Sequence, residues 1–464
     1  MTEIAAAAPL RSESQLFRPI EAKLLDRPVD LITTGRMMRE NPLSILPEML
    51  LRETILSGPY LGAKVHEIAG PQEMRSVLLD DAASWRKSPL ILRMLRPVLG
   101  DAILTAHGES WRRQRLIMQP AFMKRRIERF YPLMDDVARD TAERFAGAAE
   151  GRVEAASLLT DATFQVIERA LFSSPDDFDR QDVRRAIEVL LEEIGTMRMS
   201  DLLPVPEWAP RLMTPAALRA RSVFRRAASG QIAQRRERSD PGDDLLGLLL
   251  SARNEETGEA LSDIDIRDTL MTFIAAGHET TSIALTWSLY LLSNDEEAQA
   301  RVRAEARAAF ASDRPADAST LAALAFTRQV IEEAMRLFPP APVLGRRAIA
   351  HTQIGEREVR KGDVCLLAFY CLHRHETLWE HPHHFDPDRF SPERRPRERY
   401  AYLPFGGGAR ACIGAQFALS EAALMLARII SSCEIAPEPD YAVEPMMQVT
   451  LRPAGGLKLH VTPL

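Results

Sequence analysis

The sequence predicts a mostly α-helical fold with small β-sheets, and three observations support this prediction. Long amphipathic segments dominate the chain, above all over residues 156–173, 179–198 and 214–238. The segment 263–293 is apolar on most faces and contains no proline, so we expect one long helix that crosses the centre of the protein. Strand-like runs are short and cluster in a few places, which limits the sheets to small ones.

The strand-like runs follow in order along the chain. Within residues 60–80, the run VHEIAG predicts a strand, and the proline after it opens a helix. Residues 342–372 contain short runs broken by glycines, a pattern typical of hairpins. Residues 446–463 predict two strands around a Pro-Ala-Gly-Gly turn. In the middle of the chain, the apolar, proline-rich segment 203–210 predicts a loop.

Length and composition are those of an ordinary globular protein. The chain has 464 residues, 46% hydrophobic and 27% charged, which is ample for a large core. A net charge of −6 gives no global basic character and argues against a nucleic-acid-binding protein. Four cysteines without a C-x-x-C pair are too sparse for a disulfide framework. Because the apolar run near the N-terminus is also too brief for a membrane anchor, we expect a soluble, cytoplasmic protein.

A glycine-rich loop over residues 405–414, FGGGARACIG, carries the strongest chemical signal. Glycines let backbone N–H groups approach the sulfur of Cys412, and the helix-like segment that follows directs its positive dipole end toward it. Both effects predict a lowered thiol pKa and a thiolate, the form that ligates metals. Arg410 can meet a nearby acidic group. Taken alone, such a loop is more often a glycine-rich turn with an inert buried cysteine.

The middle of the long central segment carries a second unusual cluster, Ala276-Gly277-His278-Glu279-Thr280-Thr281. A glycine costs about 1 kcal/mol inside a helix, and a buried acid is costly unless it is paired. We therefore expect Gly277 to open the helix surface for a small ligand, with a hydroxyl from Thr280 and an ionisable group from Glu279. A simple packing notch is the alternative. His278 is assigned no ligand role.

The cysteine loop resembles the haem-thiolate loop F-x-x-G-x-R-x-C-x-G of the cytochrome P450 family. It matches at all five fixed positions, which are Phe405, Gly408, Arg410, Cys412 and Gly414. The resemblance implies haem b (iron protoporphyrin IX) as cofactor and Cys412 as the axial thiolate ligand of its iron. A zinc site or a structural cysteine would require several further motifs to coincide by accident.

Two further motifs resemble those of the same family. A-G-x-E-T resembles its oxygen-activation motif, which implies that Glu279 and Thr280 hold water and deliver protons. Glu333 and Arg336 match the E-x-x-R motif ahead of a proline turn, and the resemblance implies that Arg389 joins them in the proximal core. By themselves, Glu333 and Arg336 at i and i+3 would be a weak signal.

The resemblance also implies which side chains hold the haem propionates. Trp111 and Arg115 match the W-x-x-x-R helix motif and share one helix face at i and i+4. Arg410 is a third candidate, and Arg346 is a fourth, although the sequence leaves open whether Arg346 or its neighbour Arg347 makes the contact. Arginine suits carboxylate binding because its planar fork donates two parallel hydrogen bonds.

The implied fold is the cytochrome P450 fold of a soluble bacterial type, with a long central helix over the haem. Residues 1–464 are expected to form one catalytic domain with a short tail over about 1–15 and no fused reductase. The implied reaction inserts one oxygen atom from O2 into a hydrophobic organic substrate, by hydroxylation or oxidative dealkylation. Alternatives are a peroxygenase driven by H2O2, against which Glu279 and Thr280 argue, and a non-catalytic haem-binding sensor.

Electrons from NAD(P)H are expected to arrive through a separate ferredoxin and ferredoxin reductase. Basic residues gather at 112–129, either as a solvated surface or as a docking site for an acidic partner. By resemblance, the substrate pocket involves residues 88–105 and 199–213, together with Ala275, Ala276, Val343, Leu344 and Met447. These side chains are largely aliphatic, so the substrate is expected to be hydrophobic, with its identity and regiochemistry left open.

Overall fold

The computed structural model describes residues 11–464 except 28, 61–62, 173–179, 197, 199–210, 238–241 and 313. Helices dominate it, as predicted. They are α1 (Leu31–Glu40), α2 (Pro71–Arg75), α3 (Pro89–Leu99), α4 (Gly108–Met118), α5 (Lys124–Ile127), α6 (Tyr131–Ala146), α7 (Ala155–Leu171), α8 (Arg180–Gly195), α9 (Pro215–Glu237), α10 (Leu245–Ser251), α11 (Asp263–Ser293), α12 (Glu296–Ala309), α13 (Ala318–Ala323), α14 (Ala325–Leu337), α15 (Phe369–Leu372) and α16 (Ala415–Ser432).

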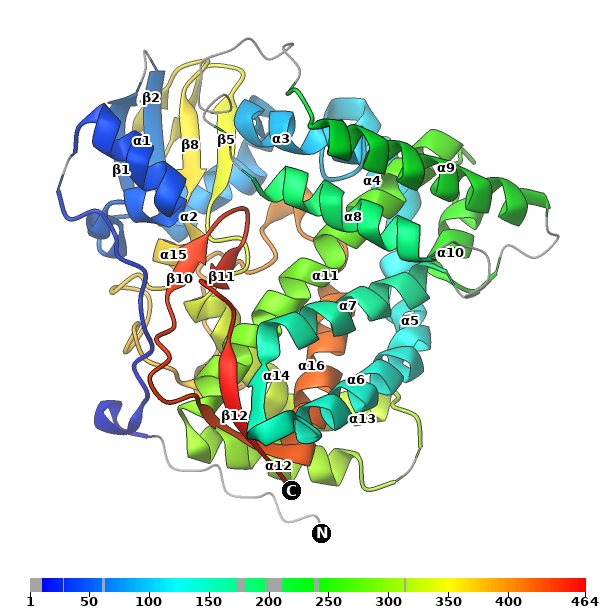
Figure 1. Ribbon diagram of the computed structural model, residues 1–464. Coiled ribbons are helices and arrows are strands. Elements are labelled where there is room, and N and C mark those ends of the chain that lie inside the picture. The colour runs from blue at the N-terminus through cyan, green and yellow to red at the C-terminus, as the bar shows by residue number, and fades with distance from the viewer. Residues whose placement is uncertain are drawn as a thin grey trace.

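The strands form small sheets, and the largest has five strands in the order β1-β2-β8-β5-β3. It lies at one side of the helical body (Figure 1). In that sheet, β2 and β8 are parallel and the other neighbours are antiparallel. The strands are β1 (Ile55–Tyr60), β2 (Ala63–Ile68), β3 (Trp85–Lys87), β4 (Arg152–Glu154), β5 (Leu344–Ala348), β6 (Thr352–Ile354), β7 (Arg357–Val359), β8 (Val364–Leu367), β9 (Cys433–Pro437), β10 (Pro445–Met447), β11 (Leu451–Pro453) and β12 (Lys458–Pro463).

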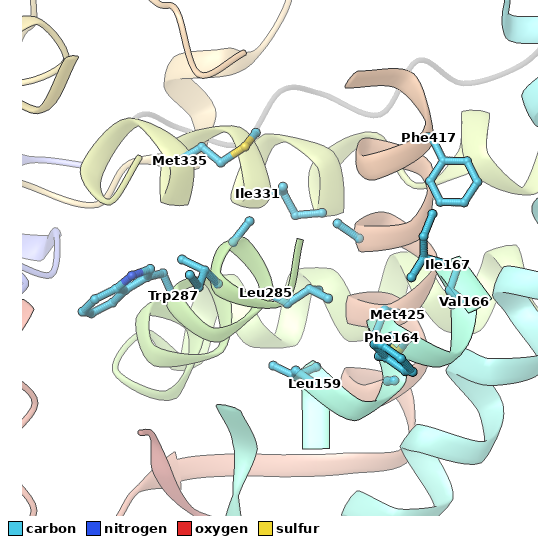
Figure 2. Close-up of a cluster of buried hydrophobic side chains, with 14 of the residues drawn as sticks. Leu159, Phe164, Val166, Ile167, Leu285, Trp287, Ile331, Met335, Phe417 and Met425 are labelled. Atoms are coloured by element: carbon cyan, nitrogen blue, oxygen red, sulfur yellow. The ribbon is translucent and has the colours of Figure 1, made fainter. Parts of the chain in front are cut away.

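The central helix α11 has the predicted boundaries and runs through the middle of the molecule (Figure 1). It begins with a capping box, in which the Ser262 hydroxyl accepts from the N–H of Asp265 and the Asp265 carboxylate accepts from the N–H of Ser262. Figure 2 shows Leu285 and Trp287 of α11 among core side chains of α7, α14 and α16. A helix buried on most sides thereby organises the core, and it also positions the site described below.

Most of the predicted elements are present. The three amphipathic segments form α7, α8 and α9, and the run at 60–80 forms β2 followed by α2. The predicted hairpins at 342–372 are antiparallel strands, β6 with β7 and β5 with β8. The predicted loop at 203–210 lies outside the described residues. In the described part of the chain, no helix is both long enough and apolar enough to cross a membrane.

The C-terminal strands differ from the prediction. Residues 446–463 were expected to form two strands around one turn, but the chain changes sheets there. Strand β11 pairs with β10, whereas β12 pairs with β4 and β9 in a separate three-stranded sheet. The glycines at 455 and 456 have φ of 74° and 87°, which lets the backbone turn away from the first sheet. Register and partner choice depend on distant strands, so local turn chemistry did not reveal them.

Candidate functional site

The cysteine loop has a backbone conformation that favours glycine at two positions. Gly406 and Gly408 have φ of 71° and 65°. A Cβ atom on Gly408 would lie 1.9 Å from the main-chain oxygen of Leu78, so no side chain fits there. The Cys412 N–H donates to the Phe405 carbonyl oxygen at 2.9 Å and closes the loop. Helix α16 then begins directly after Gly414, which places the helix N-terminus beside the cysteine.

Two properties of the Cys412 side chain indicate an open space, or hollow, inside the fold. Its accessible area places it among the exposed residues. Protein atoms nevertheless surround the sulfur closely enough that burial raises the pKa of its thiol. An open space inside the fold, through which solvent reaches the sulfur, explains both the accessible area and the raised pKa.

The predicted lowering of the Cys412 pKa is wrong for the protein by itself. Burial raises the pKa, and this effect is stronger than the opposing effects of the Gly414 N–H and the Arg115 guanidinium. The reason is that a thiolate loses more hydration in this hollow than one N–H and one cation restore. A metal cation on the sulfur supplies the missing stabilisation, as expected for a ligand thiolate.

The middle of α11 borders an open space as well. Ala276 is exposed, and Ala275 and Thr280 are half-buried, whereas residues 271–274 and 281–289 are buried. Thr280 donates from Oγ1 to the carbonyl oxygen of Ala276 at 2.8 Å. Its hydroxyl therefore keeps acceptor capacity for a hydrogen bond from water or a ligand at this opening.

Gly277 lies against helix α7. A Cβ atom there would lie 3.4 Å from the Ile167 side chain, which is an ordinary van der Waals contact that does not require glycine. The two interpretations considered from the sequence, an opening for a ligand and a packing notch, stay predictions. His278 is a core residue, because its ring lies edge-on to Phe164 at 5.6 Å and Nδ1 lies 2.6 Å from the Ile274 oxygen.

The Glu279 carboxylate points toward the C-terminal strands and makes no hydrogen bond with the Thr280 hydroxyl in the described structure. Its Oε1 accepts from Thr450 Oγ1 at 2.8 Å and from the Arg452 guanidinium at 2.6 Å. The acid is therefore held as an ion pair by strand β11 and the residue before it. Neither Thr450 nor Arg452 belongs to a recognised sequence motif, and only the tertiary structure reveals this contact.

Glu333, Arg336 and Arg389 meet in a buried cluster. Arg336 donates two hydrogen bonds to the Glu333 carboxylate, at 2.7 and 2.8 Å. Arg389 reaches the same carboxylate at 3.5 Å, and the Asp386 N–H adds a hydrogen bond at 3.0 Å. Neither Glu333 nor Arg336 has any exposed surface. The cluster ties α14 to the segment that leads into the cysteine loop.

Three of the predicted propionate-binding arginines converge on the cysteine loop and its surroundings. Arg115 donates to the Ala411 oxygen at 3.0 Å, and Arg410 donates to the Ala106 oxygen at 3.2 Å. The Arg410 guanidinium also lies over the Trp111 ring, 4.3 Å from its centre. Arg346 is buried and donates to the Gly345 oxygen at 3.1 Å.

These guanidinium groups have no acidic partner among the residues that the structure describes. Burial lowers the pKa of Arg410 to about 10, and repulsion from Arg346 adds to this effect. Burial also lowers the pKa of Arg346. Cations withdrawn from water without counter-charges are costly, so an anion from outside the chain would stabilise this arrangement. The two carboxylates of haem fit this need, and the sulfur in the hollow fits its iron.

The predicted pocket residues are apolar and incompletely buried. Ala275, Val343, Leu344 and Met447 are half-buried, and Ala276 is exposed. Residues 88–105 contain α3, whereas 199–210 lie outside the described residues. Sequence reasoning did not find Lys87 and His107, which lie close to the arginines. Their positions depend on sheet pairing and loop packing, for which the sequence carries no local signal.

Comparison with known proteins identifies the family. The family model described as Cytochrome P450 matches residues 59–461. Cyclooctatin synthase of Streptomyces melanosporofaciens is 32% identical over 92% of this chain and 92% of its own length. Pentalenene oxygenase of Streptomyces avermitilis is 32% identical over 84% of this chain and 86% of its own length. The crystal structure of the cytochrome P450DA haem domain matches with a TM-score of 0.77, 29% identity, and coverage of 89% of this chain and 90% of that one.

The chain belongs to the cytochrome P450 family, and its fold is the cytochrome P450 fold. It is a haem-thiolate monooxygenase whose cofactor is haem (iron protoporphyrin IX). As in the family, it uses O2, redox partners and a hydrophobic substrate. The predictions of family, fold class, reaction type and cofactor are thereby confirmed.

Proposed function

We propose that Cys412 is the axial ligand of the haem iron and that Arg115, Arg346 and Arg410 hold the haem carboxylates with Trp111. The observation that carries this proposal is a Cys412 sulfur that is accessible but closely surrounded by protein, together with three nearby arginines, one buried and two half-buried, that have no acidic partner among the described residues. Of the two candidates on β5, Arg346 fits because it is buried and its charge acts on Arg410.

Thiolate-bound haem supplies the oxygen chemistry, in which one atom of O2 enters the substrate and the other leaves as water. The protein supplies the surroundings for this reaction. Phe405, Gly408 and Gly414 shape the loop that presents Cys412. Glu333, Arg336 and Arg389 keep the segment before that loop in place.

Thr280 and Glu279 are proposed to manage protons. The Thr280 hydroxyl donates to Ala276 and so offers an acceptor position to water at the opening of α11. Glu279 is held by Thr450 and Arg452, on the side of the helix that faces the C-terminal strands. We propose that Glu279 relays protons from that side to water at Thr280. The apolar residues Ala275, Ala276, Val343, Leu344 and Met447 would line the substrate pocket and exclude other water.

The electron donor is proposed to be an acidic ferredoxin, supplied by an NAD(P)H-dependent reductase. Exposed basic residues gather beside α4, which contacts the cysteine loop through Arg115. Arg113 and Arg129 form ion pairs within the chain, but the exposed Arg112, Lys124, Arg125 and Arg126 show no ion pair in the described structure. Met123 next to them is 62% exposed. A basic surface with an apolar centre complements an acidic partner.

Two broader proposals accompany these assignments. The largest cluster of buried hydrophobic residues runs from Ala22 to Val461, which supports a single cytochrome P450 catalytic domain over residues 1–464. The cysteines are all free thiols, which supports a cytoplasmic location.

The carbon monoxide difference spectrum of the reduced protein tests the ligand assignment. We expect the far-red-shifted Soret band of thiolate ligation in the wild type. Cys412→Ala is expected to lose this band together with monooxygenase activity, whereas Cys433→Ala, which changes another thiol in β9, keeps both. A thiolate-type band in Cys412→Ala would refute the assignment.

A further inference from the structure

Ser57 and His66 form a cross-strand pair in the five-stranded sheet. Strand β1 lies at the edge of this sheet next to β2, and their antiparallel register places Ser57 directly opposite His66. Directly opposite residues project to the same face of a sheet. The Ser57 Oγ lies 2.9 Å from Nδ1 of His66, which is the distance of a nucleophile from its general base. Ser57 is exposed and His66 is buried, so an accessible hydroxyl is bonded to a base that the sheet holds in place.

Asp363 lies on the other side of the His66 ring, just before β8. Its Oδ2 is 3.7 Å from Nε2 of His66. The Asp363 carboxylate is buried and accepts hydrogen bonds from the N–H of Lys64 at 2.9 Å and the N–H of Arg360 at 2.8 Å, which fix its position. A carboxylate in this place favours the ring tautomer that has its proton on Nε2. Nδ1 then carries the lone pair and can accept the Ser57 proton.

A structural role alone does not account for this histidine. Nε2 of His66 is buried and has no hydrogen-bond partner among the described residues. A buried polar atom without a partner is costly, so a histidine that served only the sheet would be expected to bond through both nitrogens. Burial lowers the pKa of His66, and this effect outweighs the opposing effect of Asp363. The ring is therefore neutral at pH 7 and able to accept a proton.

A cation lies near the pair. Arg357 of β7 donates from Nη2 to the main-chain oxygen of Ile55 at 3.5 Å, and Ile55 precedes Ser57 by two residues in β1. The positive charge of Arg357 also acts on His66. A cation near a nucleophile can stabilise the negative charge that forms on a carbonyl oxygen during attack. The cluster therefore combines a nucleophile, a base, an acid that orients the base, and a group for charge stabilisation.

We infer that Ser57, His66 and Asp363 form a second reactive site, which hydrolyses small carboxylic esters. Ser57 Oγ attacks the ester carbonyl carbon while His66 Nδ1 takes its proton. The bond from that carbon to the alcohol oxygen breaks, and His66 gives the proton to the leaving alcohol. Water then cleaves the acyl-serine by the same route, which releases the acid and restores Ser57. The haem takes no part in these steps, so this inference is independent of the proposed haem site.

Labelling of the haem-loaded protein tests the nucleophile. A fluorophosphonate bonds to an activated serine with loss of fluoride, and we expect peptide mass spectra to place this label on Ser57. Hydrolysis of p-nitrophenyl acetate is measured in parallel, without an electron donor. Ser57→Ala should lose the label and most of the hydrolysis, and His66→Gln should react about a hundredfold more slowly, the low end of what a general base contributes. Ser229→Ala, which changes an exposed serine of α9, should behave as the wild type.

An unlabelled Ser57 in the wild type, or unchanged ester hydrolysis in Ser57→Ala, would overturn the inference. Because Ser57 is exposed, its replacement should leave the fold and the carbon monoxide difference spectrum unchanged. The pH profile tests Asp363 as a positioning residue. The charged groups that act most on His66 are Asp363, Lys64 and Arg357, so loss of the negative one in Asp363→Asn should move the midpoint of the labelling rate to lower pH. An unmoved midpoint would show that Asp363 serves the fold alone.

Discussion

Two groups of buried or half-buried arginines in this protein differ in how their charge is balanced. In the first, Arg336 and Arg389 share the Glu333 carboxylate, and main-chain oxygens take most of the remaining donors. In the second, Arg346 and Arg410 donate only to main-chain oxygens in the described structure. We conclude that a charge cluster whose counter-charge lies within the chain stabilises the fold. A cluster without a counter-charge in the chain indicates a binding site for an anionic ligand.

Removing the shared acid of the balanced cluster should have the largest effect. Glu333→Ala leaves two guanidinium groups buried without a counter-charge, and we expect a loss of about 3–5 kcal/mol in the free energy of unfolding. Urea unfolding measures this change. The exposed pair Arg36–Glu40 provides the control, because Glu40→Ala should cost less than about 1 kcal/mol. A loss below about 1 kcal/mol in Glu333→Ala would contradict the conclusion that this cluster stabilises the fold.

The unbalanced cluster should respond in the opposite way. Arg346→Met removes an uncompensated cation, so we expect little change or a gain in the stability of the haem-free protein. The haem-loaded protein should lose its cofactor about tenfold faster, because a hydrogen-bonded charge pair is missing. Unfolding of the two forms and haem transfer to an acceptor protein measure the two effects. Equal destabilisation of both forms would show that Arg346 serves the fold alone.

The pH dependence of stability provides a further test of the balanced cluster, through His373. It lies beside the balanced cluster, its Nε2 accepts from the Leu403 N–H at 2.9 Å, and burial lowers its pKa to about 3, helped by Arg336 and Arg374. The unfolded state, in which the histidine has its ordinary pKa of about 6.5, binds more protons than the folded state between these two pKa values. Stability should therefore fall as the pH drops from about 6.5 toward 3, with a slope of up to about 1.4 kcal/mol per pH unit from this residue.

The matched variant isolates this contribution. His373→Gln keeps a hydrogen-bond acceptor and cannot titrate, so its stability should depend less steeply on pH over the same interval. Urea unfolding of both proteins between pH 4 and 7 gives the difference in slope. Identical slopes would mean that His373 titrates equally in the folded and unfolded states.

The smallest expected effect concerns Thr280, which we propose to act together with Glu279, an acid whose charge Arg452 balances. Thr280 is predicted to affect the coupling of electrons to product and not the binding of haem. Thr280→Ala should lower the product formed per electron by about fivefold, roughly 1 kcal/mol, and release peroxide instead. Thr281→Ala is the control, because Thr281 makes the same bond one turn back, to Gly277, but is buried. Unchanged coupling in Thr280→Ala would remove Thr280 from the mechanism.

Local patterns in the sequence predicted much of this protein. The extent of α11 followed from an uninterrupted apolar segment without proline, which is a property of neighbouring residues. The cysteine loop could be recognised from its fixed pattern of residues. Gly408 belongs to that pattern because its positive φ and its contact with Leu78 permit no other residue.

Other properties were decided by tertiary structure alone. Whether the Cys412 pKa rises or falls depends on how densely distant segments surround the sulfur, and the sequence argument predicted the wrong direction. The contact between Glu279 and Arg452 joins residues far apart in the chain. The position of Ser57 opposite His66 depends on the register of two strands. Spacing along a chain encodes the geometry of neighbours, but desolvation and charge balance arise only when remote segments pack together.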